Sequence, residues 1–324
     1  MSSERIQLCG TTLDERYRLT RRIAVGGTGV VFEGRCLVDD SAIAVKTLRP
    51  CFVGHPDLGR RLCREGEVSR RVVHPGIVRV LAEGLLEDSS PYVVMPLMQG
   101  ESLADLLHRV RRLPVDELAA LVMRVTSVLQ SVHLEGYVHR DVKPEHVLLN
   151  RDPGGQLCVH LLDFGVCSSR RAPVEERARE EGKVFGTPTY ASPEQAAGKV
   201  DIDGRADLFS LGVLMFESLS GRVPFRGASV SKLLLSIMRD DPPTLESVLP
   251  GVDPALAGLV ARLLERDPLR RLPSARGLQR ALMCHVGDRR VAERRLMTRL
   301  RRQVEAPAAG TGKRVPRPLV PQVA

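Results

Sequence analysis

The stretch His139-Arg140-Asp141-Val142-Lys143-Pro144-Glu145-His146 decides how the rest of this chain is interpreted. It carries a carboxylate, an ammonium group and an imidazole within a few positions of one another. A neutral imidazole offers one nitrogen lone pair, whereas magnesium, a hard cation, prefers oxygen ligands. If the stretch serves a magnesium-dependent reaction, His146 is therefore the position where the metal chemistry is in question.

Two further groups of residues, one on each side of this stretch, suggest phosphate chemistry. Downstream, Asp163-Phe164-Gly165 follows an apolar run, which places a carboxylate at the end of a strand, where it can hold a magnesium ion. Upstream, Lys46 ends the apolar run Ala42-Ile43-Ala44-Val45. A lysine inside a strand is costly unless its ammonium has an anionic partner, and Glu65 on the next predicted helix is a candidate.

Each of these signals also has an ordinary interpretation when it is taken alone. Lys46 can be a lysine whose ammonium reaches solvent, and Glu65 can belong to a solvated helix face. Asp163-Phe164-Gly165 can be a simple turn. The segment Gly26-Gly27-Thr28-Gly29 is more often a tight turn than a phosphate cradle. The order of the motifs along the chain favours the functional interpretation.

In that order the chain resembles the eukaryotic-like serine/threonine protein kinases, particularly their bacterial (Hanks-type) branch. The resemblance covers about residues 17–283 and rests on five motifs in sequence. These motifs are the glycine-rich loop, Ala44-Val45-Lys46, His139-Arg140-Asp141, Asp163-Phe164-Gly165 and Gly186-Thr187-Pro188-Thr189-Tyr190-Ala191-Ser192-Pro193-Glu194. Asp207 and Gly212, which open a central helix, and Arg271, placed to pair with Glu194, also match the family.

The resemblance implies an α+β, two-lobed protein-kinase fold. We expect a small antiparallel β-sheet N-lobe with one helix over residues 17–98 and a mainly α-helical C-lobe over 99–283. Residues 1–16 would be an N-terminal extension, and residues 284–324 a basic helix followed by a disordered tail rich in Pro, Ala and Gly.

Apolar spacing agrees with this organisation. It predicts strands at residues 17–23, 30–32, 42–46, 77–81 and 92–95, and a helix at 57–72. Further helices are predicted at 115–134, 207–220, 231–239, 254–264, 274–283 and 288–305. In the last of these, Leu296, Met297, Leu300 and Val304 share one face.

The family mechanism gives each matching residue a role. Asp141 would orient the acceptor hydroxyl and take its proton, and Lys143 would steady the transferring phosphoryl group. Lys46, held by Glu65, would bind the α and β phosphates of ATP. Asp163 would hold Mg²⁺, with His146 at the second metal position.

The same resemblance places ATP between the lobes. The adenine would lie against Val31 and Ala44, with Met95 behind it, and would bond the backbone around Pro96 and Met98. Backbone amides of the glycine-rich loop would cover the phosphates. The expected loop residues are Ile23, Ala24, Gly26, Gly27 and Gly29.

Two positions depart from the family pattern. Ala24 stands where the first glycine is usual, and its methyl group is tolerable if φ stays negative there. His146 stands where the metal-binding Asn is usual, which leaves three interpretations. It fills space while Asp163 supports slow turnover, it shifts the preference from magnesium to manganese, or it cripples the site and leaves a nucleotide-binding pseudokinase. The survival of the other catalytic residues favours retained activity.

The activation segment, residues 163–194, gives a further hypothesis. Arg140 precedes the catalytic Asp, and such kinases usually need a phosphorylated loop residue to neutralise that arginine. Between Arg170 and Val184 there is no Ser, Thr or Tyr. Glu180 or Glu181 would act as the fixed negative charge, although a solvated charge run is an equal alternative. Ser168, Ser169 and Thr187 remain candidate phosphosites.

Composition narrows the function class. The net charge of +9 sits largely after Cys284, where ten Lys or Arg face three Asp or Glu, so we expect no nucleic-acid partner for the body. Seven cysteines without paired metal-ligand spacing indicate reduced thiols, and the charged start is no secretory signal. With no transmembrane segment expected, the sequence predicts a cytoplasmic protein.

Three functions therefore remain open. The leading one is an ATP-dependent serine/threonine protein kinase acting on protein hydroxyls in bacterial signalling. The alternatives are a nucleotide-binding pseudokinase scaffold and, least favoured, a small-molecule phosphotransferase. The basic tail would dock on the kinase body, bind an acidic partner or be inert, and its apolar stripe favours docking.

Overall fold

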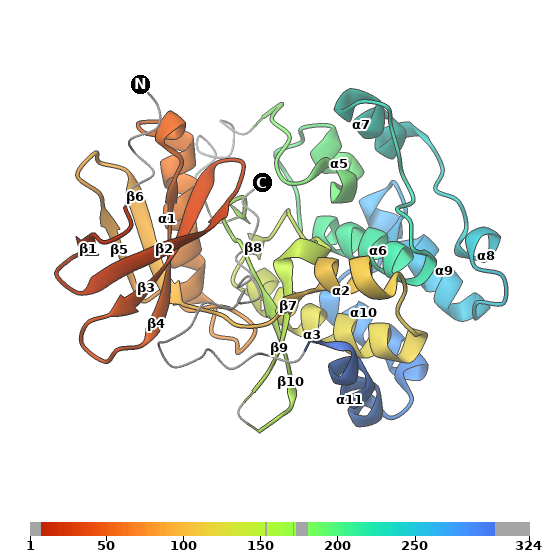
Figure 1. The fold of residues 1–324 in the computed structure, drawn as a ribbon. Coiled ribbons are helices and arrows are strands. Elements are labelled where there is room, and N and C mark those ends of the chain that lie inside the picture. Colours follow the sequence, from red (N-terminus) through yellow and green to blue (C-terminus); the bar gives the residue numbers. More distant parts are fainter. Residues whose placement is uncertain (1–7, 153, 171, 173–180, 302–324) are drawn as a thin grey trace.

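The chain folds into two lobes, a β-sheet lobe and a helical lobe (Figure 1). The computed structural model describes residues 8–152, 154–170, 172 and 181–301. The predicted α+β, two-lobed architecture is confirmed. Within the described residues, no helix combines the length and apolarity needed to span a membrane.

The N-lobe is built on a six-stranded antiparallel sheet with strand order β1-β2-β3-β4-β6-β5. Its strands are β1 (Thr12–Leu13), β2 (Tyr17–Val25), β3 (Gly29–Cys36), β4 (Ala42–Leu48), β5 (Ala82–Leu85) and β6 (Pro91–Pro96). Tyr17, Phe32, Ile43, Val45 and Tyr92 form the centre of its core. β1 lies before the predicted first strand and adds an edge strand to the sheet, with Leu13 paired to Tyr17 of β2.

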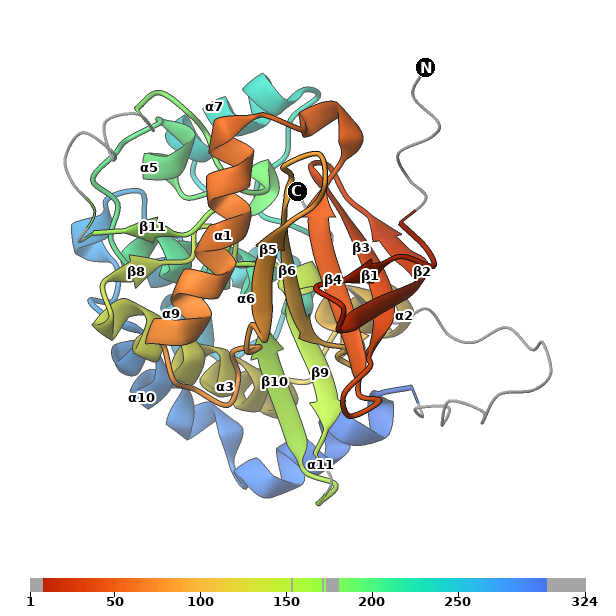
Figure 2. The ribbon, with the colours of Figure 1, turned by 90° about the vertical axis from the view of Figure 1, so that its left-hand side faces the viewer.

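A single long helix, α1 (Pro56–Arg71), crosses beside this sheet (Figure 2). A short 3₁₀ turn, η2 (Pro50–Phe52), leads into it from β4. Leu62 and Val68 face inward, while Asp57 near its start and Arg70 and Arg71 near its end suit the helix dipole. The predicted helix is therefore confirmed within one residue at either end.

The predicted strand at residues 77–81 is wrong. Ile77 makes only an isolated parallel bridge to Leu161, and the strand forms later, as β5. The backbone N–H of Val80 donates to Ser69 Oγ of α1 at 2.7 Å, and only the N–H of Leu81, at the end of the segment, reaches β6, at Val94 O. Local apolar content could not reveal that competing hydrogen bond.

The C-lobe is mainly helical and contains the largest hydrophobic core. Its helices are α2 (Leu103–Val110), α3 (Val115–Leu134), α5 (Pro193–Ala196), α6 (Arg205–Ser220), α7 (Val230–Arg239), α8 (Leu245–Val248), α9 (Pro254–Leu263), α10 (Ala275–Val286) and α11 (Arg289–Arg299). The turns η4 (Pro188–Tyr190) and η5 (Pro268–Arg270) connect them. After its first residue, α6 is buried at every position except Glu217, and this helix forms the buried centre of the lobe.

Two small sheets carry the loops that face the N-lobe. β9 (Val147–Arg151) pairs with β10 (Leu157–Leu161) and with β7 (Glu101–Ser102), while β8 (Tyr137–Val138) pairs with β11 (Ser168–Ser169). The stretch 139–146 lies between β8 and β9 and includes the turn η3 (Pro144–His146). Strands therefore fix both ends of this loop.

The last described helix, α11, lies beneath α3 at the base of the C-lobe in both ribbon views (Figures 1 and 2). Asp288 caps it by accepting the N–H groups of Arg290 and Val291. Leu296, Met297 and Leu300 are buried in the C-lobe core, as a shared apolar face requires. The helix ends at Arg299, earlier than predicted, and Val304 lies outside the described residues.

Replacing Arg271 should strongly destabilise the C-lobe. Its guanidinium is buried and donates to both oxygens of Glu194, at 2.7 and 2.8 Å. Arg271→Met leaves Glu194 buried without its counter-ion, so we expect a loss of about 3–5 kcal/mol in the free energy of unfolding, measured by denaturant titration. The matched control Arg266→Met removes an exposed pair with Asp241 and should cost about 1 kcal/mol or less. Equal losses in the two variants would show that burial of the Arg271–Glu194 pair does not make it critical.

Candidate functional site

Lys46 lies at the centre of a charged group that joins the two lobes. It projects from β4, is 3% exposed, and its ammonium bonds Glu65 of α1. The same ammonium lies 3.2 Å from Asp163 Oδ2, in the loop after β10. Burial alone would lower the pKa of Lys46, but the charges of Asp163 and Glu65 raise it above its ordinary value. Lys46 is therefore a cation at neutral pH.

The two carboxylates around Lys46 differ in their proton affinity. Burial, together with the charge of Asp163, raises the pKa of Glu65 above its ordinary value, against the pull of Lys46. Burial also opposes ionisation of Asp163, but Lys46, His146 and the N–H of Gly165 hold its pKa well below its usual range. Asp163 is thus the permanent anion of the group.

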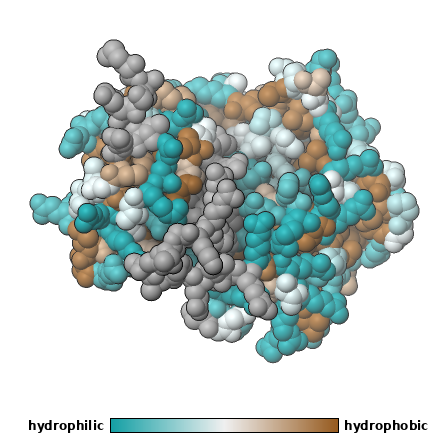
Figure 3. All heavy atoms as spheres, in the orientation of Figure 1, coloured by the Kyte–Doolittle hydropathy of each residue, from teal (hydrophilic) through white to brown (hydrophobic). Residues whose placement is uncertain are grey.

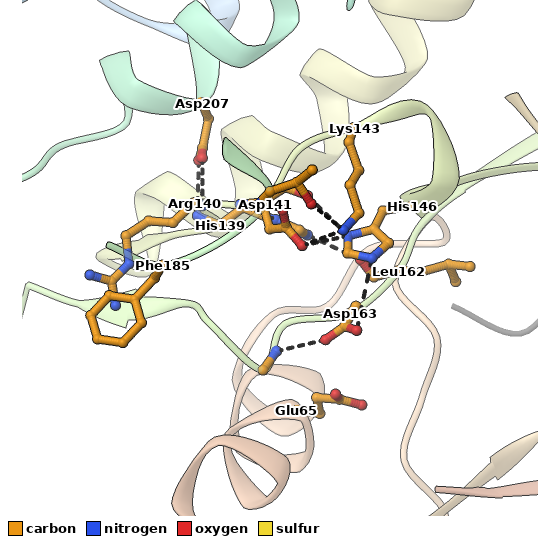
Figure 4. A network of polar contacts seen from close by, with 12 residues as sticks. Glu65, His139, Arg140, Asp141, Lys143, His146, Leu162, Asp163, Phe185 and Asp207 are labelled. Carbon is orange, nitrogen blue, oxygen red and sulfur yellow. Dashed lines mark hydrogen bonds and ion pairs between the residues drawn. The ribbon is translucent and has the colours of Figure 1, made fainter. Parts of the chain in front are cut away.

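Asp163 also has an unusual backbone. Its φ is 65°, in the left-handed region that L residues rarely adopt. The N–H of Gly165 donates to its Oδ1 at 3.1 Å, which steadies the side chain in this conformation (Figure 4). Strain of this kind persists where the surrounding structure imposes it, and it concentrates at functional sites.

Asp141 is held by contacts to both carboxylate oxygens. Oδ1 accepts the N–H of Thr187 at 2.7 Å, and Oδ2 accepts Lys143 Nζ at 2.9 Å. Lys143 Nζ also donates to Thr187 Oγ1 at 2.5 Å. Burial would raise the pKa of Asp141, but His146 and Lys143 more than offset it, so the pKa lies below its ordinary value. The group can therefore accept a hydrogen bond from a hydroxyl at neutral pH.

Asp207, at the start of α6, fixes the backbone just before Asp141 (Figure 4). Its Oδ2 accepts the N–H of His139 at 2.9 Å, and its Oδ1 accepts that of Arg140 at 2.8 Å. His133 Nε2 lies 2.7 Å from Oδ2, and Gln195 Nε2 donates to Arg140 O at 2.7 Å. These contacts hold Arg140 at a φ of 64°.

His133 and Gln195 are missing from the predicted site. His133 lies in the last turn of α3 and Gln195 lies in α5, so Gln195 in particular is distant from the loop in sequence. Gln195 also completes the capping box of α5 with Ser192. No local motif could have shown that the amide reaches Arg140.

His146 is fully buried between the carboxylates of Asp141 and Asp163. Its Nδ1 lies 3.0 Å from the carbonyl oxygen of Asp141 and 3.4 Å from Asp141 Oδ2, and its Nε2 lies 3.9 Å from Asp163 Oδ2. A carbonyl oxygen only accepts, so Nδ1 carries a proton. Nε2 is then the ring nitrogen that lies on the side of Asp163.

The glycine-rich loop joins β2 to β3. Ile23 and Ala24 lie in β2, and Ala24 pairs with Val31 without a positive φ, so its methyl group is accommodated. Gly26 and Gly27 form the turn, in which the N–H of Gly26 donates to Gly29 O at 2.9 Å. The loop closes the β2–β3 hairpin despite the departure from the family pattern, with a register shift between Arg22 and Ala24.

Only some of the predicted site residues line the pocket between the lobes. The pocket is lined by Thr28, Gly29, Lys46, Thr47, Leu48, Leu58, Arg61, Leu62, Glu65, Asp141, Asp163, Gly165 and Val166. Val31 and Ala44 lie buried on neighbouring strands, and Pro96 ends β6 shortly before Met98. Met95 pairs with Ala44 across the sheet.

The contacts of Arg140 do not test the hypothesis that a glutamate of the activation segment neutralises its charge. Its Nε donates to Val166 O at 2.9 Å, and its guanidinium lies over the ring of Phe185, 5.0 Å from the centroid. Glu180 lies outside the described residues, and Glu181 is exposed. The proposed pairing stays a prediction.

Comparison with known proteins points to one family. Residues 17–283 match the family described as protein kinase domain. The chain is 32% identical to the serine/threonine-protein kinase pkn3 of Myxococcus xanthus over 87% of its length, which spans 52% of that relative. It is 36% identical to the serine/threonine-protein kinase PknA of Mycobacterium tuberculosis, covering 82% of this chain and 60% of that one.

A solved structure agrees with these relatives. The kinase domain of Mycobacterium tuberculosis PknI superposes with a TM-score of 0.64 at 28% identity, covering 84% of this chain and 97% of that chain. The chain thus spans between about half and three fifths of pkn3 and PknA, but nearly all of a kinase domain.

The variant Asp207→Asn should lose stability in a pH-dependent way. Burial would raise the pKa of Asp207, but His133 and the N–H of His139 hold it below its ordinary value. The ionised group therefore stabilises the fold above about pH 4, and this contribution is lost as the pH falls through the folded-state pKa. In Asp207→Asn the side-chain NH₂ group faces one of the two backbone N–H groups, which is left without an acceptor. The free energy of unfolding should therefore fall by about 2 kcal/mol at pH 7. Denaturant titrations at several pH values should show that the difference in the free energy of unfolding between variant and wild type shrinks below about pH 4. A difference that does not change with pH would contradict this prediction.

Proposed function

Because the chain belongs to the protein kinase family, we propose that it is an ATP-dependent serine/threonine protein kinase that transfers the γ-phosphoryl group to protein hydroxyls in bacterial signalling. The observation that carries this proposal is the convergence of Lys46, Asp141 and Asp163 on one pocket beneath the glycine-rich loop. The three residues come from two lobes and are far apart in sequence, so the arrangement is not a by-product of one local motif.

Asp141 acts as the catalytic base in this proposal. Its lowered pKa keeps it ionised, and its two oxygens are already oriented by Thr187 and Lys143. An acceptor hydroxyl that donates to Asp141 would transfer its proton there as the oxygen attacks the γ-phosphorus, while the bond from that phosphorus to the bridging oxygen breaks and ADP leaves. Lys143 places a positive charge beside the same carboxylate, where it can stabilise the phosphoryl group during transfer.

Lys46 binds the nucleotide phosphates in this proposal. Its ammonium is fixed by Glu65 and Asp163 before ATP arrives, so little side-chain freedom is lost on binding. The loop that contains Ile23, Ala24, Gly26, Gly27 and Gly29 lies above and supplies backbone amides. Val31 and Ala44 would contact the adenine, and Pro96 and Met98 would offer the backbone groups that bond its edge.

A divalent cation would be held by Asp163 and His146. Protein kinases generally use ATP with Mg²⁺ or Mn²⁺, and the cation neutralises phosphate charge during transfer. Among the described residues no group of three or more acidic, His or Cys side chains can hold a metal alone, so phosphate oxygens would complete the coordination. The Nε2 lone pair of His146 favours Mn²⁺ over Mg²⁺.

The substrates, the cellular compartment and the role of the C-terminal segment are also part of the proposal. The substrates are proteins with Ser or Thr acceptors, since the segment around Thr187 contacts Asp141 directly. All seven cysteines are free, including the buried Cys36 and Cys167, which fits the reducing cytoplasm. The basic C-terminal segment acts as an element docked on the kinase body, which the packing of α11 on α3 supports.

The pseudokinase alternative has less support. Disabled catalysis would remove the need for an oriented base, yet Asp141, Lys143 and Thr187 form a connected network. His146 also lies where its imidazole faces Asp163. The geometry therefore favours an altered metal preference over the loss of transfer.

The variant Asp141→Asn should abolish phosphoryl transfer. An amide cannot accept the proton of the hydroxyl, so transfer from γ-labelled ATP to a generic basic protein should fall by about 100-fold or more. The control Asp40→Asn changes an exposed carboxylate in the N-lobe and should transfer like wild type. Transfer by Asp141→Asn at the wild-type rate would refute the assigned base.

The variant His146→Asn should shift the metal preference. An amide oxygen suits magnesium better than an imidazole nitrogen does, so the Mg²⁺-supported rate relative to the Mn²⁺-supported rate should rise about tenfold. His108→Asn, at an exposed position of α2, is the matched control. Unchanged metal preference in His146→Asn would assign the imidazole a purely space-filling role.

A further inference from the structure

A buried carboxylate stands directly after the segment that joins the lobes. Glu101 in β7 is only 5% exposed. Arg109 Nη2 of α2 donates to both of its oxygens, at 2.9 and 2.8 Å. The backbone N–H of Arg301 donates to Oε2 at 3.0 Å. Glu101 thus joins α2 to the end of the described chain.

Arg301 reaches Glu101 because α11 is fastened along its whole length. Arg299 donates to both oxygens of Glu117 on α3, at 2.6 and 3.0 Å, and Glu117 is 1% exposed. Arg124 of α3 forms a second two-point pair with Glu293, at 2.8 and 2.9 Å. These pairs fix the position of α11 along α3 as well as its orientation.

Backbone carbonyls of α11 add contacts at its C-terminal end. Arg151 Nη2 donates to Met297 O at 2.8 Å, and Arg109 Nη2 donates to Arg299 O at 2.7 Å. The terminal carbonyls of a helix have no partner within the helix and attract cations. Arg109 therefore contacts Glu101 and α11 at once.

α11 depends on these contacts for its helical state. It has eleven residues, and a helix shorter than about 12–15 residues is marginal alone in water. Ala292, Leu296 and Leu300 complete the apolar contact with the C-lobe. The surface over α2, α3 and α11 is mostly hydrophilic (Figure 3), as expected where charged pairs rather than an open apolar groove fasten a helix.

Glu101 is also in a position to influence the nucleotide site. Its neighbour Gly100 approaches β9 so closely that an added Cβ would lie 2.5 Å from Leu149 O. Glu101 pairs with Leu149, and β9 begins directly after His146. On the other side, Gly100 is two residues from Met98, which we assign to the adenine edge. A shift of β7 would therefore move both residues 97–100, which join the lobes, and β9, which follows His146.

We propose that Glu101 is a positioning residue for ATP, and that α11 completes its hold by bringing the N–H of Arg301 to its carboxylate. The C-terminal helix then sets nucleotide affinity from outside the pocket. This inference rests on the proposed ATP site, and it is a separate claim about residues that do not touch the nucleotide.

Two variants of the full-length protein test the proposal. Glu101→Gln keeps the shape but removes the charge that Arg109 and Arg301 bind, and Glu117→Gln weakens the anchor of α11 without touching β7. Each should raise the Kd for ATP about fivefold, measured by calorimetry, and raise the KM for ATP by the same factor while leaving kcat within about twofold. The double variant should raise the Kd for ATP by less than the product of the two single increases, because both substitutions act through Arg301.

Asp116→Asn is the matched control, since Asp116 pairs with Arg295 across the same two helices but at an exposed position. It should leave the Kd for ATP unchanged. Hydrogen exchange provides a second measurement, and amides of residues 97–102 should exchange faster in Glu101→Gln than in Asp116→Asn. If wild type binds no ATP, the proposed function fails. If wild type binds ATP and both Gln variants bind it equally well, with unchanged exchange, the role of Glu101 and α11 is refuted.

Discussion

The buried carboxylate of Asp207 is the group on which the loop 139–146 depends. It accepts two consecutive backbone N–H groups, at His139 and Arg140, directly before the proposed base. Arg140 has a left-handed backbone, which an L residue adopts at a cost of about 1–2 kcal/mol. A fixed acceptor offsets that cost, and since Asp207 belongs to the almost fully buried helix α6, the orientation of Asp141 is set by the core.

The second constraint is electrostatic and joins the lobes. One ammonium, Lys46, faces two carboxylates, and these come from different lobes, with Glu65 on α1 and Asp163 after β10. In a pocket of low dielectric such contacts are strong, but they are favourable only while each charge keeps its partner. The position of α1 is thereby coupled to the position of Asp163. Phosphates that entered this group would meet a cation whose place is already determined.

The sequence predicted the fold and the pairing of Lys46 with Glu65 because both leave signals in the sequence itself. A lysine within the apolar run that forms β4 requires an anion, and the order of the motifs identified the lobes from which the partners come. What it could not predict depends on contacts between distant segments. Ser69 Oγ accepts the N–H of Val80, and the strand forms at β5 instead of at residues 77–81. Gln195 reaches Arg140, and Glu101 meets Arg301, across separations that no spacing rule describes.

The buried glutamates of the C-lobe all pair with arginine. Glu101, Glu117, Glu194 and Glu293 each face an arginine, and each arginine offers a planar group that fits both carboxylate oxygens. Replacing such a pair by apolar side chains would often cost no stability, because desolvation consumes most of the attraction. What an apolar contact lacks is direction. Two hydrogen bonds from one guanidinium specify the position of a carboxylate along and around its partner, whereas packed methyl groups allow a helix to slide. Charged pairs are therefore suited to fixing elements whose exact position matters, which at Glu101 is the strand between the hinge and the metal position.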